Sequence, residues 1–505
     1  MNTVRTRYAP SPTGFHHLGN LRTAVFAYLT AKHEDGTFIV RIEDTDQARS
    51  VEGSVEYTVQ SLKWLGIIPD EGVYLDDQGN LTERGAFGPY TQSKRLEIYT
   101  EKAEWLVENG HAYRCFCSSE RLDALREEQQ KNKQAPRYDG YCRNLPKDEV
   151  ASRVGAGEKY VIRQAMPDNE TVEFNDVIRG EISFNSSDLD DQVLLKSDGF
   201  PTYHLASVVD DHLMEITYVH RGEEWISSTP KNLLLYKAFG WTPPLFAHLP
   251  VILGPDKSKL SKRHGAEPIL SYRDRGYLAD AVVNVLAFIG WSPGTEEEFF
   301  TLDELVSRFQ IEKVQKAAAV FDVARLDYVN GWYIRQLPLG DVVEQMLPYL
   351  VSAGLVTGAP YAIPHDVVIP KPVGEYLLTV ANAVRERLKH FDETAEVSWF
   401  FFRRPESDDA MRVLIVPKKG EYETTVAVVH EALEVLREVS STEWSHDKLE
   451  EVLRLFIAHK ELKAMEVLWP LRAALTGVAG SPGTFEMLEI LGKEESMIRI
   501  LAIVE

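Results

Sequence analysis

Two prolines, a glycine and two adjacent histidines crowd into a short stretch near the start of the chain, residues 10–22. The stretch follows a strand-like segment at residues 4–9 and precedes apolar residues at helical spacing. Proline fixes φ and glycine tolerates conformations that other residues avoid, so Gly14 and the prolines predict a tight turn. A helix that begins after such a turn offers backbone N–H groups to an anion. The stretch is a candidate phosphate site, although an ordinary surface loop with solvated histidines would have the same residues.

A second candidate for phosphate chemistry is the glycine-bounded loop at residues 254–265, Gly-Pro-Asp-Lys-Ser-Lys-Leu-Ser-Lys-Arg-His-Gly. Its density of positive charge is unusual in a chain whose formal net charge is −22. Phosphoryl transfer depends mainly on positioning and on neutralising charge that develops on the phosphate oxygens. His17 in the first stretch and Lys259 and Lys262 in the second are therefore the candidate catalytic residues.

Charged residues also follow two predicted strands. Residues 37–42 are typical of a buried strand and end in Glu43 and Asp44, and a strand near residue 218 leads to Arg221. Residues at the carboxyl ends of parallel strands line the ligand crevice of an open α/β sheet. There Glu43 would suit an ammonium group and Arg221 a carboxylate, which a guanidinium binds in a bidentate way. The alternatives are a helix cap at Asp44 and ordinary surface ion pairs.

The two phosphate stretches, in this order, resemble the two signatures of class I aminoacyl-tRNA synthetases. Two further motifs make the resemblance more specific. Pro-Ser-Pro-Thr-Gly at 10–14 and Arg-Ile-Glu-Asp-Thr-Asp at 41–46 are similar to motifs of the glutamyl-tRNA synthetases of bacteria. The resemblance extends over nearly the whole chain, to Pro-Leu-Arg-Ala-Ala-Leu-Thr-Gly at 470–477.

The resemblance implies an α/β fold, with a Rossmann-like parallel-sheet catalytic domain and an inserted α+β domain that holds the acceptor end of the tRNA. A stem-contact domain and an all-α anticodon-binding region follow. Amphipathic helices fill the chain after Leu326, which separates it from glutaminyl enzymes with β-barrels there and from short paralogues that lack the region. The expected boundaries are 1–110 and 202–255 for the catalytic domain, 111–201 for the insert, 256–338 for the stem-contact domain and 339–505 for the helical region.

Hydrophobic periodicity predicts the elements of these domains in more detail. The polar, glycine-containing residues 70–87 are expected to form an exposed loop. The C-terminal region is expected to contain helices at residues 342–355, 373–389, 424–439, 445–460 and 485–491.

Length and composition limit the class of protein. A chain of 505 residues is too long for one core and predicts about three to five domains. It has no apolar segment of signal-peptide or membrane-spanning type, and its three cysteines are too few for a disulfide framework. We therefore expect a cytoplasmic protein without membrane contact, and a monomer. The net charge opposes general RNA binding, so RNA contacts must use local basic patches.

The resemblance implies the reaction and its participants. L-Glutamate is activated with ATP, as its Mg²⁺ complex, to glutamyl-adenylate and pyrophosphate, and the glutamyl group passes to the terminal adenosine of tRNA(Glu), which releases AMP. By the resemblance, the glutamate-binding residues are Arg7, Tyr8, Ala9, Glu43, Tyr203, Ser207 and Arg221. The ATP-binding residues are Ser11, His17, Gly19, Asn20, Glu224, Trp225, Ile252, Lys259, Leu260, Ser261, Lys262 and Arg263.

Two positions depart from the family pattern. Asn20 stands where the first signature ends in histidine, so an amide must take over whatever the histidine does there. Ser207 stands where asparagine is common, which implies a shorter or water-mediated contact. A catalytically silent RNA-binding paralogue would be expected to lose His17 or the loop lysines. A general nucleotidyltransferase would have no need of the helical C-terminal region.

Basic residues in the helical region are candidates for anticodon recognition. The resemblance and the pairing of two arginines in an acidic chain point to Arg385 or Arg387, near the third anticodon base. The aromatic run at residues 399–402 could stack bases, but aromatic residues at helical spacing more often belong to a core.

The insert contains a candidate zinc site. All three cysteines of the chain, Cys115, Cys117 and Cys142, fall within the expected insert. Relatives that hold zinc there use a histidine two residues after the third cysteine, and this chain has Asn144 instead. A structural zinc site usually takes four N or S ligands, so Tyr138 would have to complete it, as a tyrosine does in the short paralogues. Otherwise the three thiols pack as small apolar groups.

Overall fold

The computed structural model describes residues 3–258, 260, 267–364, 366–418 and 420–504. The chain divides into two compact units. The first unit is Met1–Tyr272 with Ala279–Arg325, and the second is Arg273–Leu278 with Leu326–Glu505. The expected boundary at 338/339 falls inside the second unit, and the finer division into five parts stays a prediction.

The first unit is built on a six-stranded sheet in the order β11-β10-β1-β2-β3-β4. Five strands are parallel and β4 is antiparallel to β3. The chain passes from β1 to β2 on one side, and β10 later pairs with β1 on the other side. This arrangement makes the carboxyl ends of β1 and β10 a topological switch point, where open α/β sheets bind ligands. The strands are β1 Arg5–Tyr8, β2 Thr37–Val40, β3 Glu71–Leu75, β4 Leu81–Arg84, β10 Tyr218–Gly222 and β11 Leu245–Leu249.

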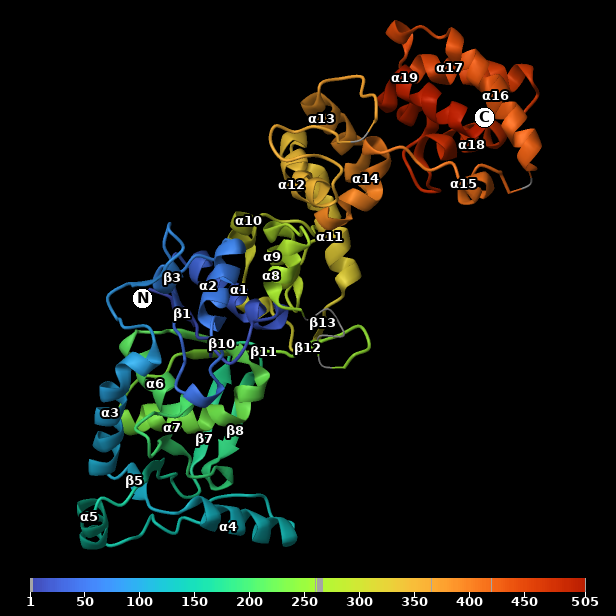
Figure 1. The fold of residues 1–505 in the computed structure, drawn as a ribbon. Coiled ribbons are helices and arrows are strands. Elements are labelled where there is room, and N and C mark those ends of the chain that lie inside the picture. Colours follow the sequence, from blue (N-terminus) through green and yellow to red (C-terminus); the bar gives the residue numbers. More distant parts are fainter. Residues whose placement is uncertain (1–2, 259, 261–266, 365, 419, 505) are drawn as a thin grey trace. The chain divides into compact units, whose positions relative to one another are not determined.

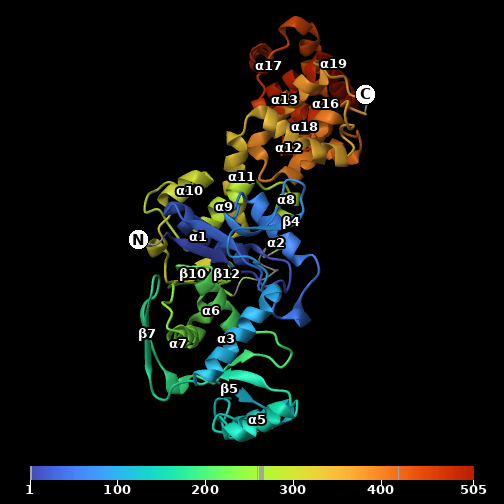
Figure 2. The same ribbon diagram turned by 90° about the vertical axis from the view of Figure 1, so that its left-hand side faces the viewer.

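Helices cover both faces of this sheet (Figures 1 and 2). Helix α1, Leu18–His33, contacts β1, β2 and β10, and its apolar residues Leu21, Val25 and Leu29 are fully buried. On the other face α6, Tyr203–Leu213, packs against α7, Thr229–Phe239. Outside the expected insert, this unit also contains the helices α2 Ser54–Trp64, α3 Leu96–Glu108, α9 Ala279–Phe288 and α10 Leu302–Arg308. The short helix α8, Ile269–Asp274, and helix α11, Val323–Gln336, span the division between the units.

The expected insert forms two small antiparallel sheets within the first unit. Strands β5 Ala112–Cys115, β6 Val161–Gln164 and β9 Val193–Leu195 make one sheet, and β7 Thr171–Asp176 pairs with β8 Gly180–Asn185 in a hairpin. The hairpin strand β7 contacts β11 of the main sheet. The exposed helices α4 Ser119–Lys131 and α5 Lys147–Gly155 complete the insert.

The predicted exposed loop at residues 70–87 is wrong, because β3 and β4 form a hairpin there. Gly72 allows β3 to approach β2 closely. Its φ is +105°, and a Cβ would lie 2.0 Å from the Val40 carbonyl oxygen, so no other residue fits so close to β2. The glycine lowers the apparent strand propensity of the sequence, yet the approach of two backbones requires it.

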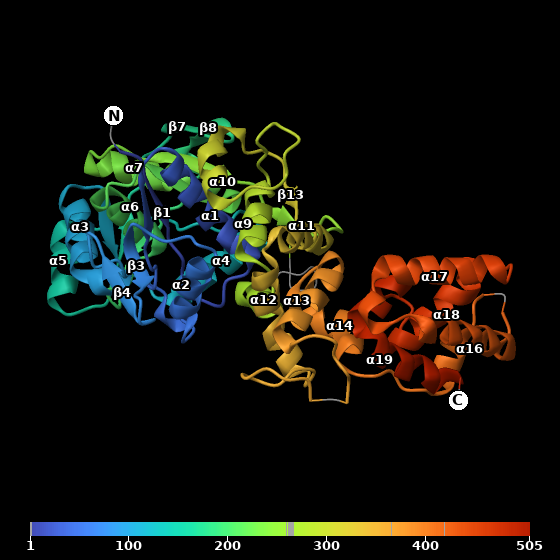
Figure 3. The same cartoon turned by 90° about the horizontal axis from the view of Figure 1, so that it is seen from above.

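The described residues of the second unit form helices joined by loops, without strands, as Figure 3 shows for α12 to α19. Its core contains the three phenylalanines Phe400, Phe401 and Phe402, so the aromatic run is mainly core, as the spacing indicates. The predicted helix at 373–389 ends at Val384 and continues as a 3₁₀ turn, while the predicted helix at 485–491 continues to Val504 with a kink at Gly492. The helices are α12 Leu339–Ser352, α13 Val373–Val384, α14 Thr394–Phe402, α15 Asp409–Leu414, α16 Tyr422–Glu438, α17 His446–His459, α18 Ala464–Thr476 and α19 Thr484–Val504.

Within the described part of the chain, we find no helix with the length and apolar character needed to cross a bilayer. The two short strands β12 Ile252–Leu253 and β13 Ala319–Val320 pair in parallel beside the main sheet.

Candidate active site

A pocket of about 940 Å³ opens at the switch point of the main sheet. Its walls come from the turn after β1, from the end of β10 and the 3₁₀ turn that follows it, and from the start of α6. Most of the residues predicted for substrate binding meet here. The predicted residues that line the pocket are Arg7, Tyr8, Ala9, Ser11, His17, Gly19, Asn20, Glu43, Tyr203, Arg221, Glu224, Trp225, Ile252 and Leu260.

Among the described residues predicted for substrate binding, Ser207 is the one that does not line the pocket. Ser207 lies one turn further along α6 than Tyr203 and is buried, so its predicted contact with glutamate stays untested. The predicted catalytic and ATP-binding residues Lys259, Ser261, Lys262 and Arg263 lie outside the described residues.

The phosphate end of the pocket is the N-terminus of α1. His17 is the N-cap residue, and its Nδ1 accepts a hydrogen bond from the Gly19 N–H at 3.1 Å. The Asn20 side-chain oxygen accepts from the His17 N–H at 3.4 Å, which completes a capping box. Because Nδ1 of the neutral ring accepts, its proton is on Nε2, where it can be donated to a phosphate oxygen. The Asn20 amide thus stabilises the start of the helix beside the proposed ATP site.

The neighbouring histidine has a different role. His16 is buried, and its Nδ1 lies 2.7 Å from the Tyr8 hydroxyl. Burial lowers the pKa of His16 to about 4, so the ring is neutral at neutral pH. An ordinary surface turn with two solvated histidines is therefore excluded.

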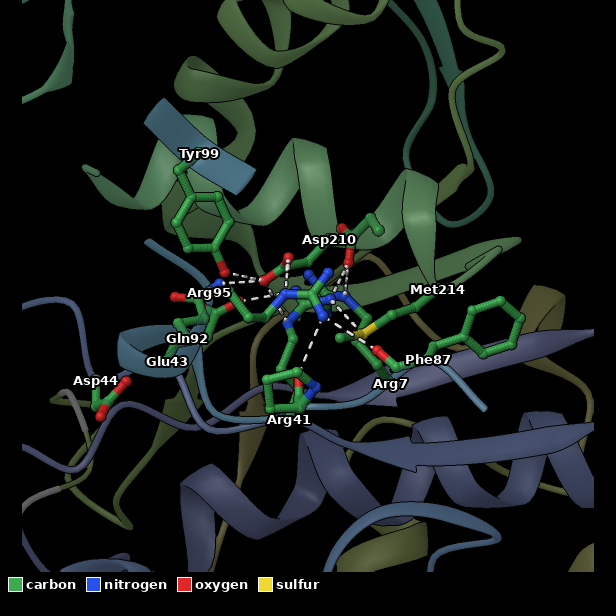
Figure 4. A network of polar contacts seen from close by, with 12 residues as sticks. Arg7, Arg41, Glu43, Asp44, Phe87, Gln92, Arg95, Tyr99, Asp210 and Met214 are labelled. Atoms are coloured by element: carbon green, nitrogen blue, oxygen red, sulfur yellow. Dashed lines mark hydrogen bonds and ion pairs between the residues drawn. The ribbon is translucent and has the colours of Figure 1, made fainter. Parts of the chain in front are cut away.

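A buried network of ions supports the other end of the pocket (Figure 4). Arg41 donates to Glu43 Oε1 and pairs with Asp211 Oδ1, each at 2.8 Å, and Arg7 Nε donates to the same Asp211 oxygen at 3.1 Å. A second carboxylate, Asp210, accepts from three groups of the segment after β4. Its donors are Arg95 at 2.8 Å, Gln92 at 2.9 Å and the Tyr99 hydroxyl at 2.7 Å.

Three arginines and three carboxylates balance within this network, and all six side chains are at least 94% buried. The sequence prediction included only Arg7 and Glu43 of these six. Arg41 stands in the Arg-Ile-Glu-Asp-Thr-Asp stretch and the aspartates in Val-Val-Asp-Asp-His, but nothing in the spacing pairs residues that are about 170 positions apart. Their charged types within apolar runs are the only signal that could have drawn attention to them.

Burial and ion pairing act against each other on these groups. Burial raises the pKa of Glu43, although Arg41 and Arg7 oppose the shift. Burial lowers the pKa of Arg7, but attraction to Asp211 outweighs it and leaves the pKa above its usual value. Burial likewise raises the pKa of Asp211, while Arg7 and Arg41 pull it below its usual value. Arg7 and Asp211 therefore hold their charges, which fixes the Arg7 guanidinium at the pocket wall.

Arg221 also lines the pocket and is 5% exposed. It is the fourth residue of β10, and its guanidinium donates to the Tyr203 hydroxyl at 3.2 Å and to the Thr229 hydroxyl at 2.7 Å. The Tyr203 ring in turn lies against Trp225, with ring centroids 4.3 Å apart. Among the charged residues that line the pocket, Arg7, Arg221 and Glu43 lie in the same pocket as a helix N-terminus, which suits a dicarboxylate amine beside a phosphate ester.

The three cysteines of the insert lie together, away from this pocket. Their sulfur atoms all lie within 4.8 Å of one another, and Cys117 and Cys142 are separated by 3.6 Å. The Tyr138 hydroxyl lies 3.3 Å from the Cys115 sulfur and 3.4 Å from the Cys117 sulfur. The predicted set Cys115, Cys117, Tyr138 and Cys142 is therefore one cluster.

The anticodon candidates lie in the second unit, in the 3₁₀ turn Arg385–Arg387. Arg387 donates to the Ser481 carbonyl oxygen at 2.6 Å. Burial and the nearby charge of Arg387 lower the pKa of Arg472, whose guanidinium lies 5.0 Å from the Trp469 ring. Arg387 is therefore close enough to Arg472 for their charges to interact, a pairing that the sequence analysis did not predict.

The mostly parallel sheet with a pocket at its switch point is typical of α/β proteins that bind ligands at the carboxyl ends of their strands. Comparison with known families gives the family: the class I tRNA synthetase (E and Q) catalytic-domain model matches residues 3–328, and an anticodon-binding-domain model matches residues 341–504. The chain belongs to the class I tRNA synthetases of the E and Q family.

Individual relatives are similar over their full length. The chain is 43% identical to the glutamate–tRNA ligase of Alkaliphilus metalliredigens over 99% of the chain and 98% of that protein. It is 42% identical to that of Clostridioides difficile, with 98% of each covered. A crystal structure of a glutamate–tRNA ligase from Elizabethkingia meningosepticum with its amino acid has a TM-score of 0.87 at 35% identity, and covers 100% of this chain and 99% of that one. The α/β fold with a helical C-terminal region is confirmed.

Proposed function

We propose that this protein is a glutamate–tRNA ligase, which makes glutamyl-tRNA(Glu) from L-glutamate, ATP and tRNA(Glu). One observation carries the proposal: a single pocket holds Arg7, Arg221 and Glu43 at one end and the N-terminus of α1 at the other. A substrate with two carboxylates and one ammonium group needs two cations and one anion, and ATP needs an anion site beside them. The family membership and the full-length relatives agree with this chemistry.

In the first step a glutamate α-carboxylate oxygen attacks the α-phosphorus of ATP and pyrophosphate leaves. Such a reaction needs positioned partners and stabilised oxygen charge more than covalent help from the protein. The helix N-terminus and the His17 Nε2 proton are placed to stabilise the phosphate oxygens. ATP enters as its Mg²⁺ complex. Lys259 and Lys262 are proposed to act on the same oxygens.

Glutamate is selected by charge. Arg7 and Arg221 are the proposed partners of its carboxylates and Glu43 the partner of its ammonium group. Each pairing places a substrate charge against a buried protein charge of opposite sign, where the interaction is stronger than in water. In the second step a ribose hydroxyl of the terminal adenosine of the tRNA attacks the mixed anhydride, and AMP leaves.

The experiment is aminoacylation. Purified protein is incubated with ATP, Mg²⁺, labelled glutamate and tRNA(Glu), and acid-precipitable label is counted. We expect glutamyl-tRNA that disappears on mild alkaline treatment, as an ester does. Absence of charging with a tRNA that another glutamate–tRNA ligase charges would contradict the proposal.

We infer that the cysteine cluster of the insert holds a structural Zn²⁺. Zinc bound tetrahedrally at about 2.3 Å places its sulfur ligands about 3.8 Å apart, close to the 3.6 Å between Cys117 and Cys142. Cys142 Sγ accepts the Phe116 N–H at 3.4 Å and Cys117 Sγ accepts from Arg121 at 3.5 Å, and such donors stabilise thiolate charge. Zinc here would order the insert, because metal-binding energy adds to folding energy.

We also propose that the enzyme works as a monomer in the cytoplasm. The tRNA substrate is used there, in translation. Light scattering during gel filtration is expected to give the mass of one chain, 57.2 kDa; twice that mass would contradict the monomer.

A further inference from the structure

We propose that Asp176 and His248 form a hydrogen-bonded relay that orients the Arg221 guanidinium for a carboxylate of glutamate. Asp176 and His248 are then positioning residues for substrate selection, and neither touches the substrate. The inference rests on the glutamate-binding role proposed above for Arg221.

The relay joins three buried side chains from three strands. Asp176 ends β7 of the insert, His248 belongs to β11 and Arg221 to β10. Asp176 Oδ2 lies 2.6 Å from His248 Nδ1, and Arg221 Nε lies 3.0 Å from His248 Nε2. The three residues are 1%, 0% and 5% exposed, so water does not compete for these hydrogen bonds.

The donors and acceptors fix one tautomer of the imidazole. The Arg221 Nε–H can only donate, so His248 Nε2 must accept and carry no proton. The proton is therefore on Nδ1, where it is donated to Asp176. Asp176 and Arg221 require the same tautomer of His248. A substitution at Asp176 that changes this tautomer therefore disrupts the hydrogen bond between His248 and Arg221.

The relay also determines which edge of Arg221 faces the pocket. A guanidinium has five N–H groups, and three of them have partners among the described residues: His248, Thr229 and Tyr203. Tyr203 takes one N–H of Nη1 and Thr229 takes one N–H of Nη2, so each of these terminal nitrogens has one further N–H to donate. Two such groups match a carboxylate in a bidentate pair. The relay holds the Nε edge away from the substrate and leaves the terminal edge for it.

Asp176 itself is rigidly held. Its Oδ1 accepts the N–H groups of Ile178 at 3.0 Å and Arg179 at 2.8 Å, and the adjacent Val177 N–H donates to the Phe246 carbonyl at 2.9 Å. Burial raises the pKa of Asp176, but the hydrogen bonds from His248 and from the turn lower it below its usual value. The carboxylate thus stays ionised, and the insert contributes a fixed charge behind the pocket.

The decisive variant is Asp176→Asn, which is nearly isosteric. The amide oxygen replaces either Oδ1, which accepts two N–H groups of the turn, or Oδ2, which faces His248 Nδ1 and accepts the His248 backbone N–H at 3.1 Å. In the first orientation the NH₂ group faces Nδ1, so the imidazole carries its proton on Nε2, opposite the Arg221 Nε–H. In the second orientation the NH₂ group faces the N–H groups of the turn, which displaces the side chain that orients the imidazole. Both orientations disturb the hydrogen bond to Arg221. Displacement of a binding group by about 1 Å can cost about 10²-fold. We expect KM for glutamate to rise about 10- to 100-fold, with smaller changes in KM for ATP and in kcat.

The matched control is Asp191→Asn in the same insert. Asp191 is also buried and accepts a backbone N–H, from Met166 at 2.9 Å, and a hydroxyl, from Tyr113 at 2.7 Å, but it does not touch the relay. We expect its KM for glutamate to match wild type after correction for active protein. The melting temperatures of Asp176→Asn and Asp191→Asn show whether both substitutions destabilise the fold to the same extent.

Two variants of His248 test the relay without changing Asp176. The amide of His248→Gln reaches the position of Nε2 and can place its oxygen opposite Arg221, whereas the amide of His248→Asn reaches only the position of Nδ1. We expect KM for glutamate to increase in the order wild type, His248→Gln, His248→Asn. Equal KM for glutamate in wild type, Asp176→Asn and His248→Asn would overturn the relay. So would an equal loss of glutamate and ATP affinity. An inactive wild-type protein would instead overturn the proposed function.

Discussion

Arg221 is the residue whose replacement most directly tests glutamate binding. Arg221→Ala removes one partner of a desolvated charge pair, which costs about 2–5 kcal/mol, so kcat/KM for glutamate should fall accordingly. Arg221→Lys should rescue little, because an ammonium group cannot form the two parallel hydrogen bonds of a guanidinium–carboxylate pair. Steady-state kinetics at saturating ATP and tRNA measure this loss.

The control for Arg221 is Arg437→Ala, which removes an exposed arginine of α16 in the second unit. Its kcat/KM for glutamate should equal that of wild type. A wild-type value for Arg221→Ala would remove this residue from the glutamate site.

At the residue scale, the sequence identified side chains that line the pocket and missed the buried side chains that hold them in place. Arg7, Glu43, Tyr203 and Arg221 were predicted because family wording and strand ends mark them, and all four line the pocket. Asp211, which fixes Arg7, was not predicted. Its partner is 204 positions away, and no local pattern relates an aspartate within an apolar run to a distant arginine.

The start of α1 has two roles that a pair of variants can separate. Asn is a good N-cap residue, so His17→Asn should keep the stability of the helix but lose the imidazole donor. We expect an unchanged melting temperature and a fall in kcat of about 10²- to 10³-fold, the usual loss of one transition-state donor. His17→Ala should lose the same activity and also about 1 kcal/mol of stability.

Melting curves and single-turnover rates of both variants make this comparison. If His17→Asn charges tRNA at the wild-type rate, His17 serves only as the helix cap.

The insert gives an element-scale prediction about metal. Protein purified without chelator should contain one zinc per chain, and Cys142→Ser should lose it, because the remaining groups cannot complete four-fold coordination. Chelation should lower the melting temperature of the wild type. Zinc analysis with a melting curve decides the point: well under one zinc per chain, and melting unaffected by chelator, would leave three packed thiols.

Elements with strong periodicity were predicted well, and those defined by close contact were not. The spacing of Leu21, Val25 and Leu29 predicted α1, and the structure confirms it. Residues 70–87 read as a loop, because their strands are short and polar and one contains Gly72. The pairing of β3 with β2 through that glycine is a tertiary contact, and it overrides local propensity.

For the whole molecule, we expect stability to fall as the pH drops from about 6.5 to about 4. Burial lowers the pKa of His16 and of His204 to about 4 and that of His220 to about 3. An unfolded histidine has a pKa near 6.5, so in this window the unfolded chain binds more protons and gains stability. Each histidine contributes at most about 1.4 kcal/mol per pH unit.

Urea titrations at pH 7.5, 6.0 and 5.0 measure the effect. The free energy of unfolding should be nearly constant above pH 7 and decrease below it. A value at pH 5.0 equal to that at pH 7.5 would contradict the burial of these three imidazoles.

The second unit is expected to set the choice of tRNA. The charge of Arg387 acts on Arg472, whose guanidinium lies over the Trp469 ring. Arg387→Gln should therefore change the ratio of charging of tRNA(Glu) to tRNA(Gln) by an amount equivalent to about 1–3 kcal/mol. Arg385→Gln, in the same 3₁₀ turn, is the matched comparison and decides between the two predicted arginines. An unchanged charging ratio in both variants would show that neither arginine recognises the anticodon.

The central claim is that one pocket selects glutamate and activates it for transfer to tRNA. The most direct measurement is AMP release by the wild-type protein with tRNA(Glu) and ATP, with glutamate, glutamine and aspartate supplied singly at equal concentration. The two arginines and Glu43 predict that glutamate supports turnover, that glutamine fails because it lacks the second carboxylate, and that aspartate fails because it is one methylene too short. Turnover with glutamine or aspartate equal to that with glutamate would contradict the account.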